Sequence, residues 1–219
     1  MPLMRPTRLG TFAVVLGLGA TACGSSSSDS STAPTSASAP PSSSSATAPS
    51  SPAGGSQAPV PVESNPPGDI PDNLAFVPYT NTATGYSFTH PEGWAEQENG
   101  AAVTFTDKLN GVSADTASVP PQLDEATVRA QEVPRLSAAE TAFELVSVAP
   151  ASLPAGNGVL IVYRRNSAPD PVTGRQVRAE VQEYLVSKGT SSVRLALFGP
   201  VGADNVDAYR TIAQSLTLR

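Results

Sequence analysis

The side chains that most often carry out chemistry in proteins are scarce in this chain. Its 219 residues include one cysteine, Cys23, and one histidine, His90. A single cysteine excludes an internal disulfide bond, and one cysteine with one histidine cannot form a cluster of zinc ligands. The sequence has no G-x-S-x-G nucleophile elbow, no phosphate-binding P-loop and no dinucleotide-binding glycine motif. We therefore expect neither a bound metal nor a cofactor.

Two sets of titratable residues have types that catalysis uses. His90 could act as a base together with a serine and a carboxylate, but a structural or exposed histidine is the simpler interpretation. The paired carboxylates of a glycosidase would be Glu96 with Glu98, or Asp170 with Glu180. Nothing in their spacing along the chain brings either pair to the separation of ~5–9 Å that this chemistry needs. The sequence therefore predicts a protein that is not an enzyme.

Other residues are of types that bind partners. Trp94, the sole tryptophan, is either an anchor for a partner or a core ring that locks the turn before it, and we favour the core. Arg164 and Arg165 form the only adjacent basic pair and precede the loop of residues 166–174, which includes Asp170. Because loops often carry binding residues, Arg164, Arg165 and Asp170 are candidate partner-binding residues. A solvated strand end is the alternative.

The charge of the chain argues against nucleic acid as a partner. Thirteen lysines and arginines stand against nineteen acidic residues, which gives a formal net charge of −6. No stretch is rich in lysine and arginine, although binding to a phosphate backbone depends on such stretches. The acidic residues are scattered, and we expect them to keep the surface solvated.

The amino-terminal segment has the pattern of an export signal. Residues 1–8 include two arginines and no acidic residue, and residues 9–20 are mostly apolar. This run is too short to cross a hydrocarbon core, which needs about 20 apolar residues, but it fits the apolar region of a signal peptide. The small residues Ala20, Thr21 and Ala22 then provide a cleavage site. We therefore assign residues 1–22 to a signal peptide.

Residues 20–23, Ala-Thr-Ala-Cys, also resemble the lipobox of bacterial lipoproteins, although that family usually has leucine at the position of Ala20. The resemblance implies that the sulfur of Cys23 receives a diacylglyceryl group and that the signal peptide is cut before it. Two or three acyl chains, such as palmitate, would anchor the mature protein stably to the extracytoplasmic face of the cell membrane. The alternative is a secreted protein with a free terminal thiol, which an oxidising compartment disfavours.

A low-complexity segment follows this cysteine. From Gly24 to about Asp72 the chain consists mainly of serine, alanine, threonine and proline. Such a composition cannot bury enough apolar surface to offset the entropy of ordering its backbone. We therefore predict that residues 23–72 comprise the lipidated cysteine and a disordered linker. Serine and threonine with proline also suit an O-glycosylated stalk, and an unmodified spacer is the alternative.

Aromatic and β-branched residues return in residues 73–219, which we assign to one globular domain. Strands are predicted, between turn residues, at 86–89, 103–106, 112–119, 142–148, 159–163, 177–182 and 193–197. The unbroken apolar run 159–163 suits a central strand covered on both faces. Asn110-Gly111 and Lys188-Gly189 are the expected hairpin turns.

Two helices complete this domain. Asp124 can cap a helix over residues 125–133, which the next residue, a proline, would end. Apolar residues recur at helical spacing within residues 206–216, with Asn205 or Asp207 as the cap. Strands with one helix between them and one at the end favour an α+β fold, a mainly antiparallel sheet flanked by helices.

Two stretches of the domain resemble PsbP-like domains, the family of the extrinsic photosystem II subunit. Residues 85–94, Gly-Tyr-Ser-Phe-Thr-His-Pro-Glu-Gly-Trp, match the G-[FY]-S-[FI]-x-x-P-x-G-W opening of that family. Residues 199–207 are similar to the end of lipid-anchored actinobacterial members. The resemblance implies an α/β/α sandwich and a family of adaptor and assembly subunits with unrelated partners. The metal-binding residues of photosynthetic members have no counterpart here, so no photosystem role is carried over.

Three hypotheses of function remain. The first, which we favour, is a non-catalytic binding or assembly module of the cell envelope, with an unknown envelope protein or lipid as its partner. The second is a carrier of an apolar or lipid ligand, which requires a pocket of several hundred Å³. The third is an envelope hydrolase, which requires a nucleophile and a base that converge in the fold.

Overall fold

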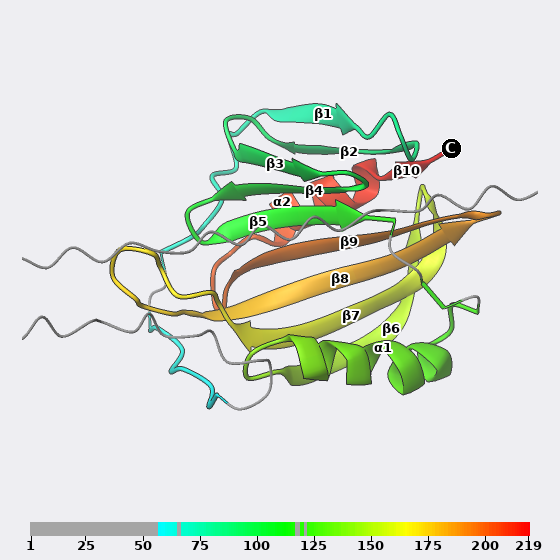
Figure 1. The fold of residues 1–219 in the computed structure, drawn as a ribbon. Helices are drawn as coiled ribbons and strands as arrows, with labels where there is room; N and C mark the ends of the chain where they lie inside the picture. Colours follow the sequence, from blue (N-terminus) through cyan, green and yellow to red (C-terminus); the bar gives the residue numbers. More distant parts are fainter. Residues whose placement is uncertain (1–56, 65–66, 117–118, 121) are drawn as a thin grey trace, which may run out of the picture. The chain divides into compact units, whose positions relative to one another are not determined.

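The computed structural model describes residues 57–64, 67–116, 119–120 and 122–219 (Figure 1). The expected signal peptide, Cys23 and residues 24–56 of the expected linker lie outside the described residues, so their assignments stay predictions. Within the described part of the chain, no helix is both long enough and apolar enough to span a bilayer.

A seven-stranded antiparallel sheet forms the centre of the domain (Figure 1). In β9, the buried Val193, Leu195 and Leu197 share one face of this sheet, because alternate side chains of a strand point the same way. In spatial order the strands are β3 (Ala95–Asn99), β4 (Ala102–Asp107), β5 (Asn110–Asp115), β9 (Ser191–Pro200), β8 (Arg178–Lys188), β7 (Gly156–Asn166) and β6 (Glu144–Leu153).

Two different layers cover the two faces of the large sheet. On one face lies α1 (Glu125–Ala139), whose Val128 and Leu136 share an apolar cluster with Ile161 and Leu185. On the other face, Ile212 belongs to a larger cluster that joins three further strands and a helix to the sheet. These elements are α2 (Val206–Ser215) and a small antiparallel sheet of β1 (Phe76–Thr80), β2 (Tyr86–Pro91) and β10 (Thr217–Leu218).

The predicted α+β fold with a mainly antiparallel sheet and flanking helices is confirmed. The third layer differs from that of a simple α/β/α sandwich, because it contains the small sheet beside α2. The β8–β9 hairpin is confirmed as well, with Lys188 paired to Ser191 and Gly189 in the left-handed backbone region at a φ of 62°.

The helix α1 begins as predicted but does not end at Pro134. The Asp124 side chain accepts a hydrogen bond from the backbone nitrogen of Thr127 at 2.7 Å, which caps the helix. The helix then continues through the proline to Ala139. Val128 and Leu136 lie on either side of the proline and are both buried, so their burial offsets the hydrogen bond that a proline removes from a helix interior.

Two strands differ from the prediction, β6 in its length and β7 in its position within the sheet. β6 continues through Pro150, beyond the predicted strand of residues 142–148, because β6 is an edge strand and an edge residue needs no second ladder hydrogen bond. β7 is not a central strand covered on both faces, since it lies second from that edge and its Leu160 and Val162 are only half-buried.

The turn between β4 and β5 lies two residues earlier than predicted. Lys108 and Leu109 form the turn, and Asn110 begins β5. The Asn110 side chain is buried and donates to the carbonyl oxygen of Gly68 at 2.6 Å. This tertiary hydrogen bond holds Asn110 in the strand, although local turn preference would place an asparagine followed by glycine at the tip of the hairpin.

The described residues of the expected linker, 57–64 and 67–72, are structured against the domain, which corrects the predicted boundary. Ile70 is buried in the larger apolar cluster, and its backbone nitrogen donates to the Asn205 side chain at 2.7 Å. Asn205 therefore precedes α2 without capping it through its side chain. The Asn166 side chain likewise binds the backbone of residues 58 and 60.

Candidate functional site

His90 is a structural residue. Its buried ring stacks on Phe105 with the ring centroids 3.7 Å apart, and its Nδ1 lies 3.0 Å from the carbonyl oxygen of Pro91. Burial lowers the pKa of His90, so the ring is neutral at pH 7. Its ring makes no hydrogen bond to a serine or a carboxylate within the described ranges, and the arrangement that a serine hydrolase needs is not formed around it.

The predicted carboxylate pairs do not converge on a cleft. Glu96 and Glu98 lie on the exposed strand β3, and Glu98 accepts a hydrogen bond from the Tyr79 hydroxyl at 2.5 Å. Asp170 and Glu180 line two different cavities. In the part of the chain that the structure describes, no three histidine, cysteine or acidic side chains are grouped so that they could hold a metal.

Trp94 belongs to the core rather than to an exposed surface. Its side chain is 8% exposed and lies in the larger apolar cluster. Gly93, which precedes it, has a φ of 83°, which a residue with a side chain rarely adopts. The interpretation of Trp94 as a core ring beside a turn is confirmed.

The candidate binding site is a groove of about 580 Å³ at one end of the large sheet. It opens on the sheet face that carries α1, where Arg165, Ala179 and Phe198 from β7, β8 and β9 face it. The β4–β5 turn and the loop of residues 167–177 provide its walls, together with Glu63 and Pro67 from the amino-terminal part of the described chain. The loop is drawn in gold at the left of Figure 1.

Apolar side chains form the floor of this groove. Phe198, paired with Gly111 in the β5–β9 ladder, lays its ring over that glycine. A Cβ atom at residue 111 would meet the ring, so only glycine leaves room for it. Leu109, Val177 and Ala179 extend the apolar surface, and the guanidinium carbon of Arg165 lies 5.4 Å from the centre of the Phe198 ring.

Charged side chains form the rim of the groove, and they are not equally engaged. Arg175 binds Glu63 of the amino-terminal segment at 2.7 Å. Arg165 donates from Nη1 to Glu140 at 2.8 Å, while its buried Nε has no partner among the described residues. Lys108 makes no side-chain hydrogen bond or ion pair with any described residue, and its backbone has a φ of 52°.

Asp170 shapes the loop that forms one wall. Its Oδ1 accepts hydrogen bonds from the backbone nitrogens of Val172 and Thr173, at 3.0 and 2.7 Å, and from the Thr173 hydroxyl. These bonds, first among them the backbone bond from Thr173, lower the pKa of Asp170. The carboxylate is therefore charged at pH 7, but its interactions are already made within the loop.

The structure brings Arg165 and Asp170 together in the groove and places Arg164 elsewhere. Arg164 binds Glu180 at 3.1 Å, on the opposite face of the sheet, because consecutive residues of a strand point to opposite faces. Sequence reasoning missed Lys108 and Phe198. The only local signal for Phe198 is an aromatic residue just before Gly199-Pro200 at a strand end.

A buried cluster of charged residues lies between α1 and the sheet, beside the groove. Arg194 of β9 lies 2.9 Å from Glu132 of α1 and 2.7 Å from Glu183 of β8. Its Nε is close to Glu183 without the alignment of a hydrogen bond, so this contact is mainly one of charge. Arg135 makes a second contact with each carboxylate, at 2.7 and 3.4 Å. Burial raises the pKa of Glu183 against the attraction of both arginines.

One tyrosine joins this cluster to the groove. The Tyr163 hydroxyl lies 3.3 Å from Glu183 and 3.4 Å from Glu140, and burial, with these carboxylates, raises the pKa of Tyr163. Because Glu140 holds Arg165 at the edge of the groove, a continuous chain of polar contacts leads from beneath α1 to the rim.

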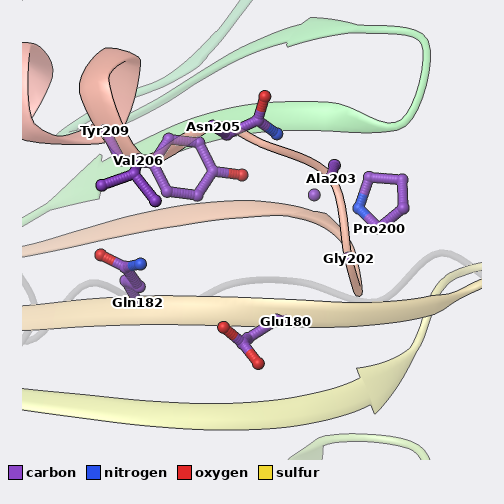
Figure 2. Close-up of a pocket in the computed structure, with 9 residues that line it drawn as sticks. Glu180, Gln182, Pro200, Gly202, Ala203, Asn205, Val206 and Tyr209 are labelled. Carbon is purple, nitrogen blue, oxygen red and sulfur yellow. The ribbon is translucent and has the colours of Figure 1, made fainter. Parts of the chain in front are cut away.

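A second, much smaller cavity of about 80 Å³ lies on the other face of the sheet, between β8 and the start of α2 (Figure 2). Glu180 and Gln182 of β8 and Tyr209 of α2 line it. The buried Tyr209 hydroxyl has no partner of good geometry among the described residues. Burial raises the pKa of Tyr209, and the nearby Asn205 offsets part of that rise. The cavity has room for a few water molecules only.

Comparison with known proteins gives structural neighbours only. No family model matches the chain, and no curated protein matches it. A protein of unknown function from Pseudomonas aeruginosa is 12% identical over 66% of this chain and 97% of its own, with a TM-score of 0.43. Cyanobacterial PsbP (CyanoP) from Synechocystis is 15% identical over 71% of this chain and 100% of its own, with a TM-score of 0.43.

A third neighbour is LpqN of Mycobacterium tuberculosis, a protein involved in cell envelope biogenesis. It is 13% identical over 67% of this chain and 92% of its own, with a TM-score of 0.33. CyanoP is a PsbP protein, the family that residues 85–94 resemble. Likeness at these identities and scores identifies neither a family nor a function for this chain, and the family resemblance stays a prediction.

Proposed function

We propose that this chain is a non-catalytic binding module of the cell envelope, attached to the membrane through lipid on Cys23, and that the groove is its binding site. One observation carries the proposal. The groove has a volume of about 580 Å³, within the range of ~300–1,000 Å³ typical of ligand sites, and it combines an apolar floor with a few polar groups as such sites do. Its partner is a protein or lipid of the envelope, and not a nucleic acid.

The engagement of the titratable side chains supports a binding role over a catalytic one. His90 is stacked on Phe105 and directed to a backbone carbonyl. The oxygen of Asp170 that faces its own loop accepts three hydrogen bonds. Neither group is poised to take a proton from a substrate.

Carriage of an apolar or lipid ligand is the second candidate function, and the volume of the groove favours it. The two candidates differ in what remains bound. Native mass spectrometry of the purified chain is expected to retain a lipid-sized mass if the chain is a carrier. Recovery of the bare polypeptide together with a cross-linked protein from cells would favour an assembly module.

The anchor is tested by metabolic labelling with a fatty-acid analogue. The wild-type chain is expected to take up the label and to fractionate with membranes, whereas a Cys23→Ser chain does neither. Because Cys23 is the only cysteine, no other thiol can substitute for it. Equal labelling of the two chains would rule out the anchor and leave the groove untouched.

The groove is tested by photo-cross-linking in cells. A photoreactive amino acid at Val172, which is 90% exposed between two groove-lining residues, is expected to capture the partner. Val206 is the matched control, because it is also an exposed valine but lies on α2 at the other face of the sheet. Capture from Val206 and not from Val172 would contradict the assignment of the groove.

A further inference from the structure

The groove occupies a part of the sheet face that α1 leaves uncovered. The helix covers this face through Val128 and Leu136 and ends at Ala139. Glu140, the residue after the helix, binds Arg165 at the edge of the groove. Beyond that contact the sheet continues with Phe198, which faces the groove instead of a helix.

The floor of the groove suits an apolar chain rather than a polar group. Three segments that meet there contribute Leu109, Val177 with Ala179, and the ring of Phe198. An apolar chain laid along these side chains would remove apolar surface of both partners from water, which is the main favourable contribution to such binding.

The rim of the groove offers cationic donors, and its two carboxylates, Glu63 and Asp170, already have interactions of their own. Glu63 is paired with Arg175, and Asp170 is engaged by the amides of its own loop. Lys108, by contrast, has no partner in the described ranges. In Arg165, Nη1 donates to Glu140, and Nη2 makes no hydrogen bond with any residue that the structure describes, so that Nη2 is available as a donor.

We infer that the groove binds a long-chain carboxylate, with the apolar chain on the Phe198 floor and the anionic head between Lys108 and Arg165. This inference rests on the proposed binding function and names its ligand. Guanidinium and ammonium groups form their strongest hydrogen bonds with anionic oxygens. A cationic head would be repelled by Lys108, and a neutral head would leave the charge of Lys108 without a counter-ion, whereas Arg165 is already paired with Glu140 through Nη1.

Binding is measured on the full chain carrying Cys23→Ser, which is recovered without lipid and needs no detergent. Isothermal titration calorimetry with dodecanoate, below the concentration at which it forms micelles, is expected to show one saturable site. Dodecyltrimethylammonium, which has the same chain and a cationic head, is expected to bind at least about tenfold more weakly. Equal affinity for the two amphiphiles would overturn the inference.

A substitution at the β4–β5 turn tests the role of the head group. Lys108→Asn removes the charge but keeps a residue that tolerates the left-handed backbone conformation. We expect the Kd for dodecanoate to rise about tenfold, the typical effect of losing a hydrogen bond to a charged group. Arg164→Gln is the control, because it removes a neighbouring cation from the opposite face and is expected to leave the Kd unchanged. An unchanged Kd in Lys108→Asn refutes the assignment of the head group.

The location of the site is tested with a single introduced thiol. In the Cys23→Ser chain, Ala168→Cys places the only cysteine on the groove wall, at an exposed position. Reaction with a bulky maleimide is expected to abolish dodecanoate binding, whereas the same treatment of Val206→Cys is not. Circular dichroism of each labelled chain shows whether it stays folded, and persistent binding in the labelled Ala168→Cys chain would place the ligand elsewhere.

Failure of this inference is distinguishable from failure of the proposed function. If Val172 captures a protein in cells but dodecanoate shows no titration, the binding module stands and the long-chain carboxylate is rejected. If dodecanoate binds as expected but Cys23 is not lipidated, the ligand assignment stands and the membrane attachment is rejected.

Discussion

Replacing Arg194 by methionine tests whether the charged cluster beneath α1 joins the helix to the sheet. Among the described residues, Arg194 alone contacts both buried carboxylates from the sheet side, at 2.9 Å from Glu132 and 2.7 Å from Glu183. These two carboxylate side chains are only 7% and 3% exposed. Methionine fills a similar volume without a charge, so the change removes the charge and leaves most of the packing.

The expected loss of stability depends on the contacts that Glu132 and Glu183 keep after Arg194 is replaced. After the substitution, both carboxylates depend on Arg135, whose side chain is 44% exposed and lies 3.4 Å from Glu183. Breaking a buried ion pair by removing one partner costs about 3–5 kcal/mol, because the other charge stays buried. Because Arg135 remains, we expect about 3 kcal/mol. Arg129→Met, which breaks the half-exposed pair with Glu125, is the control and is expected to cost about 0.3–0.5 kcal/mol.

The free energy of unfolding is measured by urea denaturation at several values of pH. Burial already raises the pKa of Glu183 in the folded chain, and loss of Arg194 removes the largest opposing effect. A carboxyl whose pKa is raised by folding destabilises the protein as the pH rises from its unfolded value through its folded value. The difference in stability between wild type and Arg194→Met should therefore be smaller at pH 5 than at pH 7.5.

Two outcomes would contradict this reasoning. A loss at pH 7.5 no larger than that of Arg129→Met would mean that the buried carboxylates are stabilised without Arg194. A loss that grows as the pH falls would mean that the pKa of Glu183 responds to Arg194 with the opposite sign. In either case the cluster would not be the connection between α1 and the sheet that its distances indicate.

Three further predictions address packing and titration. Gly158→Ala places a Cβ atom 1.9 Å from the backbone oxygen of Leu185, and is expected to lower the melting temperature strongly, through a loss of about 3 kcal/mol. Ile70→Ala is expected to lower the free energy of unfolding, measured by urea denaturation, by about 2–4 kcal/mol. A change near zero would mean that residues 67–72 belong to the linker and not to the domain. Burial, and a hydrogen bond to Glu98, raise the pKa of Tyr79 to about 12, and Glu98→Gln should lower it in an ultraviolet titration.

The parts of the fold that could be predicted from the sequence are those fixed by neighbouring residues. The β8–β9 hairpin follows from alternation on both sides of Lys188-Gly189, and the start of α1 from the capping aspartate. The strand β3, Ala-Glu-Gln-Glu-Asn, could not be predicted, because all of its residues are exposed and only pairing with β4 makes it a strand.

The candidate site was predictable only in part. The sequence singles out Arg165 as part of a basic pair and Asp170 as a loop residue. Because consecutive side chains of a strand point to opposite faces, the sequence also allowed the inference that Arg164 and Arg165 lie on different faces of the sheet. Lys108 and Phe198 are brought to the groove by the pairing of β5 with β9, which joins residues about ninety positions apart. No local pattern contains that information.

The amino-terminal segment has a mechanical consequence. Its contacts are polar: Glu63 binds Arg175 at the groove, and Val60 donates to Asn166 at the end of β7, whereas Ile70 is buried in the core. A pull on the chain before residue 57 would therefore separate residues 57–63 from the domain before it strained the sheet. Tension along the expected tether would alter the shape of the groove while leaving the domain folded. The affinity of the groove for a ligand would then change with the tension in the tether.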